Sequence, residues 1–262
     1  MFCYTSTMSS YLGQNFLTDS TVIQHIVSHM VEMQTKYQLD RAIEIGPGKG
    51  AITQMMMTHF PHLHLIEKDT TFKSLLHLIV EPECITRGDV LQMNPSDFQI
   101  SPQTLLYGSL PYYITSPIIS QWMIASTIRF GLFIVQKEFA EKIATNATKK
   151  SYLRRLLNYS HQVDCILTIP ATSFTPAPQV QSCLIEMRKS DPMFDTSTYD
   201  RMLILLDCIS GYKRKTLSKI RKILWDGQTI TSHWLTFTLA PEMRWKRLEE
   251  VEWSEMYDLL LQ

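Results

Sequence analysis

The sequence predicts an α/β domain of the nucleotide-binding type, followed by a smaller all-helical domain. Two observations predict the first domain: short apolar runs alternate with helical patterns up to residue 189, and one of these runs leads into a glycine-rich turn at residues 46–50. A third observation predicts the second domain, because only helical patterning follows from residue 190 onward. We therefore expect domains at residues 1–189 and 190–262, with Asp191 and Pro192 as the linker.

The elements can be assigned in order along the chain. A polar arm at residues 13–17 precedes a helix at residues 20–33, whose apolar residues recur at helical spacing after Thr18 or Asp19 as the N-cap. Bounded apolar runs predict strands at residues 41–45, 62–66, 84–87, 104–107, 130–135, 165–169 and 182–188. Helices are expected from the glycine turn to about residue 59, at 117–126 with Ser116 as the N-cap and Pro117 first, and after residue 138 to about 144. The second domain is expected to have helices at residues 199–209, 216–224 and 254–261.

The composition is that of an ordinary soluble globular protein. Of the 262 residues, 45% are apolar and 19% are charged, and no apolar run is long enough to span a bilayer. The beginning of the chain has neither the charge nor the apolar run of a targeting signal, so we expect a cytoplasmic location. The five cysteines show no C-x-x-C spacing and the eight histidines no metal-ligand spacing, which favours reduced thiols and no metal site.

The glycine turn satisfies the G-x-G-x-x-[G/A] pattern, so a nicotinamide dehydrogenase is one interpretation. Glu44, two residues before Gly46, favours another ligand, because a carboxylate meets a cationic group better than a pyrophosphate. Lys49 and Gly50 do not suit close helix packing around a pyrophosphate either. An acid beside an open glycine turn suits the ammonium and carboxylate of a methionine moiety, so the turn favours S-adenosylmethionine.

Two further acids follow the next two strands. Glu67 lies at the tip of the second strand, where an acid accepts hydrogen bonds from the ribose hydroxyls of either cofactor. Asp89 follows the third strand, and we expect it to accept a hydrogen bond from the adenine amino group of the cofactor. Because ligands of open α/β sheets bind at the carboxyl ends of the strands, these acids predict a cofactor site at that edge.

The fourth strand ends in the loop Ser109-Leu110-Pro111-Tyr112. We expect this loop to bind an exocyclic amine on a flat ring, because Ser109 Oγ and the Leu110 carbonyl can accept hydrogen bonds from the amino group while Tyr112 offers a stacking face. A later proline-stiffened segment begins at Phe174, which we expect to form the second wall of a base pocket. A plain core position for Phe174 is the alternative.

Charge is distributed unevenly along a chain whose formal net charge is zero. Residues 213–222 read KRKTLSKIRK and contain no acid, so they are a candidate surface for RNA phosphates. One solvated helix face is the alternative interpretation of this segment.

Seven segments point to a family: GQNFL, EIGPGKG, IEKD, GDV, SLPYYITSP, VQKE and FTPAPQVQS. In this order they resemble the ribosomal RNA small-subunit adenine N6-dimethyltransferases, the KsgA group, and the C-terminal segment is similar to that family's small helical domain. The resemblance implies a Rossmann-like, class I methyltransferase domain that uses S-adenosylmethionine. It also implies dimethylation of two adjacent adenines in the 3′-terminal hairpin loop of 16S rRNA, with a role in biogenesis of the small ribosomal subunit.

The resemblance also assigns residues to roles. The cofactor would be held by Asn15, Leu17, Gly46, Glu67, Asp89 and Ser109. The target adenine would meet Ser109, Leu110, Pro111, Tyr112 and Phe174, and RNA phosphates would meet Lys213, Arg214, Lys215 and Arg221. The implied partner is the small-subunit rRNA in a precursor of the 30S subunit, and we expect a monomer that needs no metal and no membrane.

One residue departs from the family pattern, because the family usually has asparagine where this chain has Ser109. Serine keeps one acceptor on a shorter side chain, which is expected either to reduce activity or to leave more room for the second methylation. We expect methyl transfer to persist, because the Leu110 carbonyl and Tyr112 are intact. Two alternatives on the same fold stay open: a ribosome-assembly factor that has lost turnover, and a large-subunit rRNA methyltransferase of the macrolide-resistance type.

Overall fold

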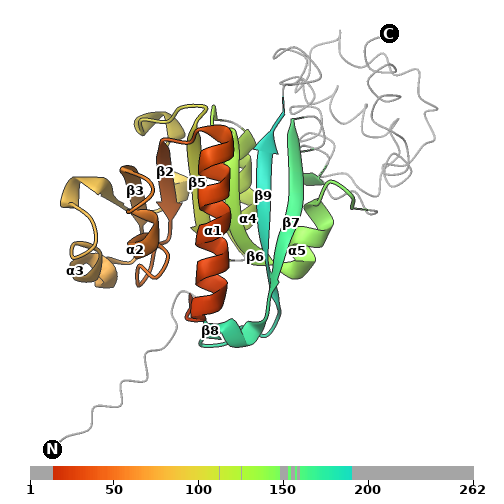
Figure 1. Ribbon diagram of the computed structural model, residues 1–262, viewed down its shortest axis with the longest axis horizontal. Helices are drawn as coiled ribbons and strands as arrows, with labels where there is room; N and C mark the ends of the chain where they lie inside the picture. Colours follow the sequence, from red (N-terminus) through yellow and green to blue (C-terminus); the bar gives the residue numbers. More distant parts are fainter. Residues whose placement is uncertain are drawn as a thin grey trace, which may run out of the picture. The chain divides into compact units, whose positions relative to one another are not determined.

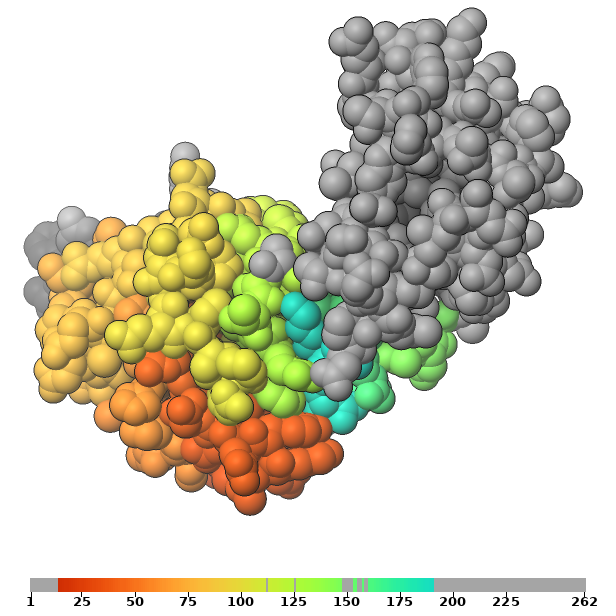
Figure 2. Space-filling view, turned by 90° about the horizontal axis from the view of Figure 1, so that it is seen from above, coloured from red at the N-terminus to blue at the C-terminus, as the bar shows by residue number. Residues whose placement is uncertain are grey.

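The structure is a computed structural model that describes residues 14–111, 113–124, 126–147, 153–154, 157 and 160–190. In Figure 2 the described segments, coloured from red to teal, pack into one continuous body. Tyr112 lies outside the described residues, and so do residues 191–262, which include the basic segment and nearly all of the predicted helical domain. Within the described ranges, every helix is too short or too polar to cross a membrane.

A seven-stranded sheet in the order β4-β3-β2-β5-β6-β9-β7 lies at the centre of the described part of the chain (Figure 1). Its strands are β2 (Arg41–Ile45), β3 (His62–Glu67), β4 (Ile85–Arg87), β5 (Thr104–Ser109), β6 (Phe130–Gln136), β7 (His161–Ile169) and β9 (Ser182–Lys189). The strands from β4 to β6 pair in parallel, whereas β9 and β7 add an antiparallel edge. The predicted α/β fold is confirmed, and each predicted strand is present.

The strand order reverses between β2 and β5. The chain adds β3 and β4 on one side of β2 and then returns to place β5 on its other side. Ligands of open α/β sheets bind outside the carboxyl ends of the strands at such a reversal. The glycine turn follows β2 and the Ser109 loop follows β5, so the topology brings these two segments to one place.

Helix α1 (Ser20–Tyr37) lies across one face of the sheet, and α4 (Thr115–Ile118) lies on the opposite face (Figure 1). Asp19 caps α1, because its Oδ1 accepts hydrogen bonds from the backbone N–H groups of Thr21 and Val22. The apolar side of α1 joins one core cluster with residues of β5, β6 and β9. The shorter helices are α2 (Thr53–Met56), α3 (Lys73–Leu76) and α5 (Lys137–Ile143).

The helix predicted at residues 117–126 differs from the expectation. It begins at Thr115, continues as a π-helical segment over Ile119–Ile124, and has Ile114 rather than Ser116 at its N-cap. The reason lies in the preceding turn, since the Pro111 carbonyl accepts a hydrogen bond from the Ile114 N–H at 3.0 Å. That turn leads directly into the first helical hydrogen bonds, so no side-chain cap separates loop and helix.

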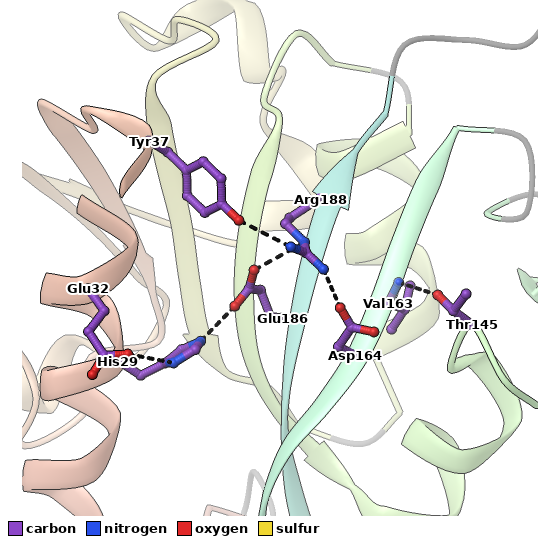
Figure 3. Close-up of polar contacts among 8 residues, drawn as sticks. All are labelled: His29, Glu32, Tyr37, Thr145, Val163, Asp164, Glu186 and Arg188. Atoms are coloured by element: carbon purple, nitrogen blue, oxygen red, sulfur yellow. Dashed lines mark hydrogen bonds and ion pairs between the residues drawn. The ribbon is translucent and has the colours of Figure 1, made fainter. Parts of the chain in front are cut away.

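A polar cluster joins α1 to the antiparallel edge of the sheet (Figure 3). His29 Nε2 lies 2.6 Å from Glu186 Oε2, and Arg188 Nε lies 3.2 Å from Glu186 Oε1. Arg188 also donates hydrogen bonds to the Tyr37 hydroxyl at 3.1 Å and to Asp164. Because Glu186 is buried, these partners compensate the cost of placing its charge between helix and sheet.

A second, two-stranded sheet pairs β1 (Phe16–Leu17) with β8 (Phe174–Thr175). The strands are antiparallel, and Leu17 is opposite Phe174. Two-residue strands carry no periodic signal, so the sequence did not predict them. This pairing connects the polar arm to the segment that begins at Phe174.

Candidate active site

A cavity of about 390 Å³ lies where the glycine turn, the acidic strand tips and the Ser109 loop meet. This volume is typical of sites for small molecules. The cavity is lined by all of the predicted cofactor residues, Asn15, Leu17, Gly46, Glu67, Asp89 and Ser109, and by the predicted substrate residues Leu110, Pro111 and Phe174. The fold therefore brings together segments from the arm to β8 that are distant in sequence.

The glycine turn presents backbone rather than side chains to the cavity. Gly46 has a φ of +69°, and a Cβ atom there would meet no atom of the described residues within 4 Å, so its open side is available to a ligand. Gly48 has a φ of +54°, and a Cβ atom there would lie 3.1 Å from the ring of Phe16. Only glycine adopts these φ values at low cost, and at Gly48 it also lets the arm approach closely.

Glu67 is held by backbone hydrogen bonds. Its Oε2 accepts from the Gly48 N–H at 3.0 Å and its Oε1 accepts from the Asp69 N–H at 2.7 Å. Burial raises the pKa of Glu67, and these two hydrogen bonds partly offset the rise. Each carboxylate oxygen keeps a second lone pair, so a carboxylate fixed in this way can still accept from vicinal hydroxyls.

Asp89 is engaged by the chain on both of its oxygens. Oδ1 accepts a hydrogen bond from the Leu91 N–H at 3.0 Å, and Oδ2 accepts from Lys68 Nζ at 2.9 Å. The hydrogen bond from Lys68 is the main reason that the pKa of Asp89 lies below its ordinary value. Lys68 is mostly exposed, so this ion pair is weak and leaves Asp89 able to accept from a ligand amine.

Glu44 is the most deeply buried acid of the cavity, with 3% of its surface exposed. Its Oε2 accepts a hydrogen bond from Thr53 Oγ1 at 2.7 Å. Burial raises the pKa of Glu44 to about 7, a rise that the Thr53 hydrogen bond opposes and the nearby Glu67 carboxyl assists. A cation beside Glu44 would reverse the effect of burial and favour the carboxylate.

The Ser109 loop closes the cavity beyond β5. Ser109 is half-buried, and Leu110 is tied to β6 because its N–H donates to the Ile134 carbonyl at 3.1 Å. Pro111 then begins the tight turn that leads into α4. Tyr113, beyond that turn, lines the rim with 69% of its surface exposed.

Phe174 is both a core residue and a lining residue of the cavity, and its role as a wall of a base pocket stays a prediction. It lines the cavity, yet only 5% of its surface is exposed and it belongs to the core cluster. Its pairing with Leu17 explains how, because β8 holds the residue at the boundary between core and cavity.

Several cavity residues were not found from the sequence: Gln14, Phe16, Lys68, Tyr107, Ile134 and Ser182. Tyr107 is the one that the sequence could have indicated most directly, because it precedes Ser109 by two residues on a strand and so shares its face of the sheet. The others belong to segments whose proximity depends on tertiary structure. Among the described residues, no group of three or more His, Cys, Asp or Glu side chains is arranged to hold a metal ion.

Comparison with known families gives a match over nearly the whole chain. The family described as ribosomal RNA adenine dimethylase matches residues 5–262. The chain belongs to this family. A relative from Mycoplasmoides gallisepticum, named ribosomal RNA small subunit methyltransferase A, is 30% identical over 260 residues, which cover 96% of this chain and 92% of the relative. A protein of the same name from Bacillus mycoides is 27% identical, over 82% of this chain and 76% of its own.

Two solved structures share the fold of this rRNA adenine dimethylase family member. The 23S rRNA methyltransferase ErmE matches with a TM-score of 0.65 and 21% identity, covering 95% of this chain and all of its own. A dimethyladenosine transferase from Plasmodium falciparum has the same TM-score at 18% identity, covering 94% of this chain and 96% of its own. At these identities the two structures support the fold and do not distinguish one RNA substrate from another.

Proposed function

We propose that this protein uses S-adenosylmethionine to dimethylate N6 of two adjacent adenines in the 3′-terminal hairpin loop of small-subunit rRNA, within a precursor of the 30S subunit. The observation that best supports this proposal is the convergence of three acidic residues and the Ser109 loop on one cavity. Membership of the rRNA adenine dimethylase family and the names of the most similar relatives support the substrate class.

The side chains of the cavity suit S-adenosylmethionine better than a dinucleotide. A pyrophosphate at the glycine turn would meet the carboxyl group of Glu44, while the two nearby lysines are engaged, Lys49 over the Phe16 ring and Lys68 with Asp89. We assign Glu67 to the ribose hydroxyls, Asp89 to the adenine amino group and Glu44 to the ammonium group. When bound, S-adenosylmethionine supplies a methyl group that its sulfonium charge makes electrophilic.

The Ser109 loop would orient the target amine. The N6 lone pair of adenine is delocalised into its ring, so the amine is a poor nucleophile until it is held out of that conjugation. Hydrogen bonds from the amino group to Ser109 Oγ and the Leu110 carbonyl would favour a tetrahedral nitrogen. This nitrogen would attack the methyl group on the sulfonium, and S-adenosylhomocysteine would leave. The proton released after transfer can leave to water, so positioning supplies most of the rate gain and no strong base is needed.

The target base must leave its stack to reach the loop. Phe174 offers a ring at the boundary of the cavity, and we propose Tyr112 as the opposite stacking face. Lys213, Arg214, Lys215 and Arg221 would contact RNA phosphates from the second domain. These assignments account for the aromatic and basic residues that the cofactor does not need.

The test is methyl transfer from labelled S-adenosylmethionine to small ribosomal subunits that lack the modification, followed by nucleoside analysis. We expect dimethyladenosine at two adjacent positions near the 3′ end. Transfer to large-subunit RNA alone would instead indicate the macrolide-resistance type of activity.

The serine at position 109 gives one alternative a specific basis, namely an assembly factor without turnover. Tight binding to the small subunit with no methyl transfer, under conditions in which the protein binds S-adenosylmethionine, would support that alternative and overturn the proposed enzyme. Monomethyladenosine alone would indicate that the pocket does not accommodate the second transfer.

A further inference from the structure

The Tyr107 hydroxyl is a buried polar atom for which the described residues provide no hydrogen-bond partner. Tyr107 lies on β5, is 1% exposed and is one of the residues that line the cavity. Leaving a buried hydroxyl unpaired is unfavourable, so an unpaired one in a pocket wall points to a ligand. If Tyr107 only filled the core, phenylalanine would pack as well without that cost.

The group next to Tyr107 indicates which kind of ligand atom fits. Tyr107 is directly opposite Glu44 in the parallel pairing of β2 with β5, and both side chains line the cavity. Burial and then the Glu44 carboxyl raise the pKa of Tyr107 well above its ordinary value, so its hydroxyl stays protonated. Glu44 accepts one hydrogen bond from the described residues, that of Thr53, which leaves it capacity for another donor.

We propose that the Tyr107 hydroxyl and the Glu44 carboxylate together bind the ammonium group at the methionine end of the cofactor, an inference that rests on the proposed use of S-adenosylmethionine. An ammonium group has three N–H donors, and the two side chains offer it a charged acceptor and a neutral one. A ligand carboxylate in the same place would be repelled by Glu44 in a poorly solvated site. The pairing therefore selects a cation, and it gives Tyr107 a binding role in addition to its place in the core cluster.

The test uses two ligands that differ only at the amino-acid end. Binding of S-adenosylhomocysteine and of 5′-methylthioadenosine, which lacks the ammonium and carboxylate groups, is measured by calorimetry on the full chain and on Tyr107→Phe. We expect the substitution to weaken S-adenosylhomocysteine binding by about tenfold or more, the loss of one hydrogen bond to a charged group, and to leave methylthioadenosine binding unchanged. Unchanged binding of S-adenosylhomocysteine, or an equal loss for both ligands, would overturn the assignment.

Two further variants sharpen the interpretation. Glu44→Gln should likewise weaken the binding of S-adenosylhomocysteine, which carries an ammonium group, and leave methylthioadenosine binding unchanged. Tyr37→Phe removes a hydroxyl that accepts from Arg188 in the polar cluster and should change neither affinity. Thermal unfolding of free Tyr107→Phe should not occur at a lower temperature than that of the unsubstituted protein, and a clear decrease would show that the hydroxyl is paired within the fold.

The same titrations separate this inference from the proposed function. If the unsubstituted protein binds neither adenosine ligand, the proposed use of S-adenosylmethionine fails. If it binds both and Tyr107→Phe binds them equally well, the cofactor assignment stands and only the role of Tyr107 is wrong.

Discussion

Ser109 occupies the last position of β5, where the side chain reaches the cavity while the strand still fixes the backbone. The side chain is half-buried, so a hydrogen bond that it accepts there is shielded from water and is worth more than one at the surface. Its reach is shorter than that of the asparagine expected at this position. In the proposed reaction, orientation of the target amine would therefore depend on one hydroxyl and on the carbonyl of Leu110.

We expect Ser109→Ala to slow methyl transfer by about 10- to 100-fold, the loss of one oriented hydrogen bond to the reacting amine. Ser109→Asn should retain activity, because it restores a side-chain acceptor. Single-turnover rates of the first and second transfers measure both effects, and S-adenosylhomocysteine affinity reports whether the cofactor pocket has changed. Equal rates for Ser109→Ala and the unsubstituted protein in both transfers would exclude a role for the side chain in the reaction.

Among the elements, the arm with β1 contacts both the glycine turn and the strand that carries Phe174. The Phe16 ring lies against Gly48, 4.6 Å from Lys49 Nζ and 5.6 Å from the ring of Phe72. Gln14 donates a hydrogen bond to Asp69 at 3.3 Å, which anchors the start of the arm beside β3. Since β1 also pairs with β8, one short segment joins the glycine turn to the strand that carries Phe174.

Phe16→Ala should weaken S-adenosylhomocysteine binding by about tenfold, because the contacts that hold the arm over the glycine turn are each worth about 1 kcal/mol. Calorimetric titration measures this loss. Phe98→Ala is the matched control, since Phe98, like Phe16, is half-buried and packs against other rings, those of His64 and Trp122. Unlike Phe16, it does not line the cavity. It should lower stability and keep the affinity. An unchanged affinity in Phe16→Ala would show that the arm does not contribute to cofactor binding.

For the first domain as a whole, two buried groups give the stability opposite dependences on pH. Burial, with a smaller contribution from Lys189, lowers the pKa of His161 to about 3, so the folded protein resists a proton that the unfolded chain accepts near pH 6.5. Stability from His161 is therefore present above pH 6.5 and is lost as the pH falls toward 3. Glu44 acts in the opposite direction, because its raised pKa makes it stabilising below pH 4.5 and less so as the pH rises through 7.

Substituting His161 should remove the loss of stability that this residue causes as the pH falls below 6.5. In the unsubstituted protein, His161 alone should lower the free energy of unfolding by about 2 kcal/mol between pH 7.5 and pH 5. Urea unfolding at both pH values measures this difference, and we expect it to be smaller by that amount in His161→Gln. The exposed His25 provides the control, because His25→Gln should keep the full difference. If the difference in the free energy of unfolding between the two pH values were unchanged in His161→Gln, the loss of stability at low pH could not be assigned to this residue.

The local patterns along the chain were sufficient for the α/β fold and for most of the candidate site. Bounded apolar runs indicated the strands and apolar residues at helical spacing indicated α1, because both patterns depend on neighbours in sequence. The acids Glu44, Glu67 and Asp89 could be placed at one edge, because parallel strands share the direction of their carboxyl ends. Ser109 followed from its position at the end of an apolar run.

Only the tertiary structure decided what depends on contacts between distant segments. The β1–β8 pairing is too short to leave a pattern, and it joins the arm to a segment that follows much later in the chain. The Tyr107 hydroxyl, which has no partner among the described residues, and the hydrogen bond from Lys68 to Asp89 depend on geometry across strands, which spacing in sequence does not contain. The sequence thus determined which chemical groups reach the site, and packing decided which of them are already paired and which remain for a ligand.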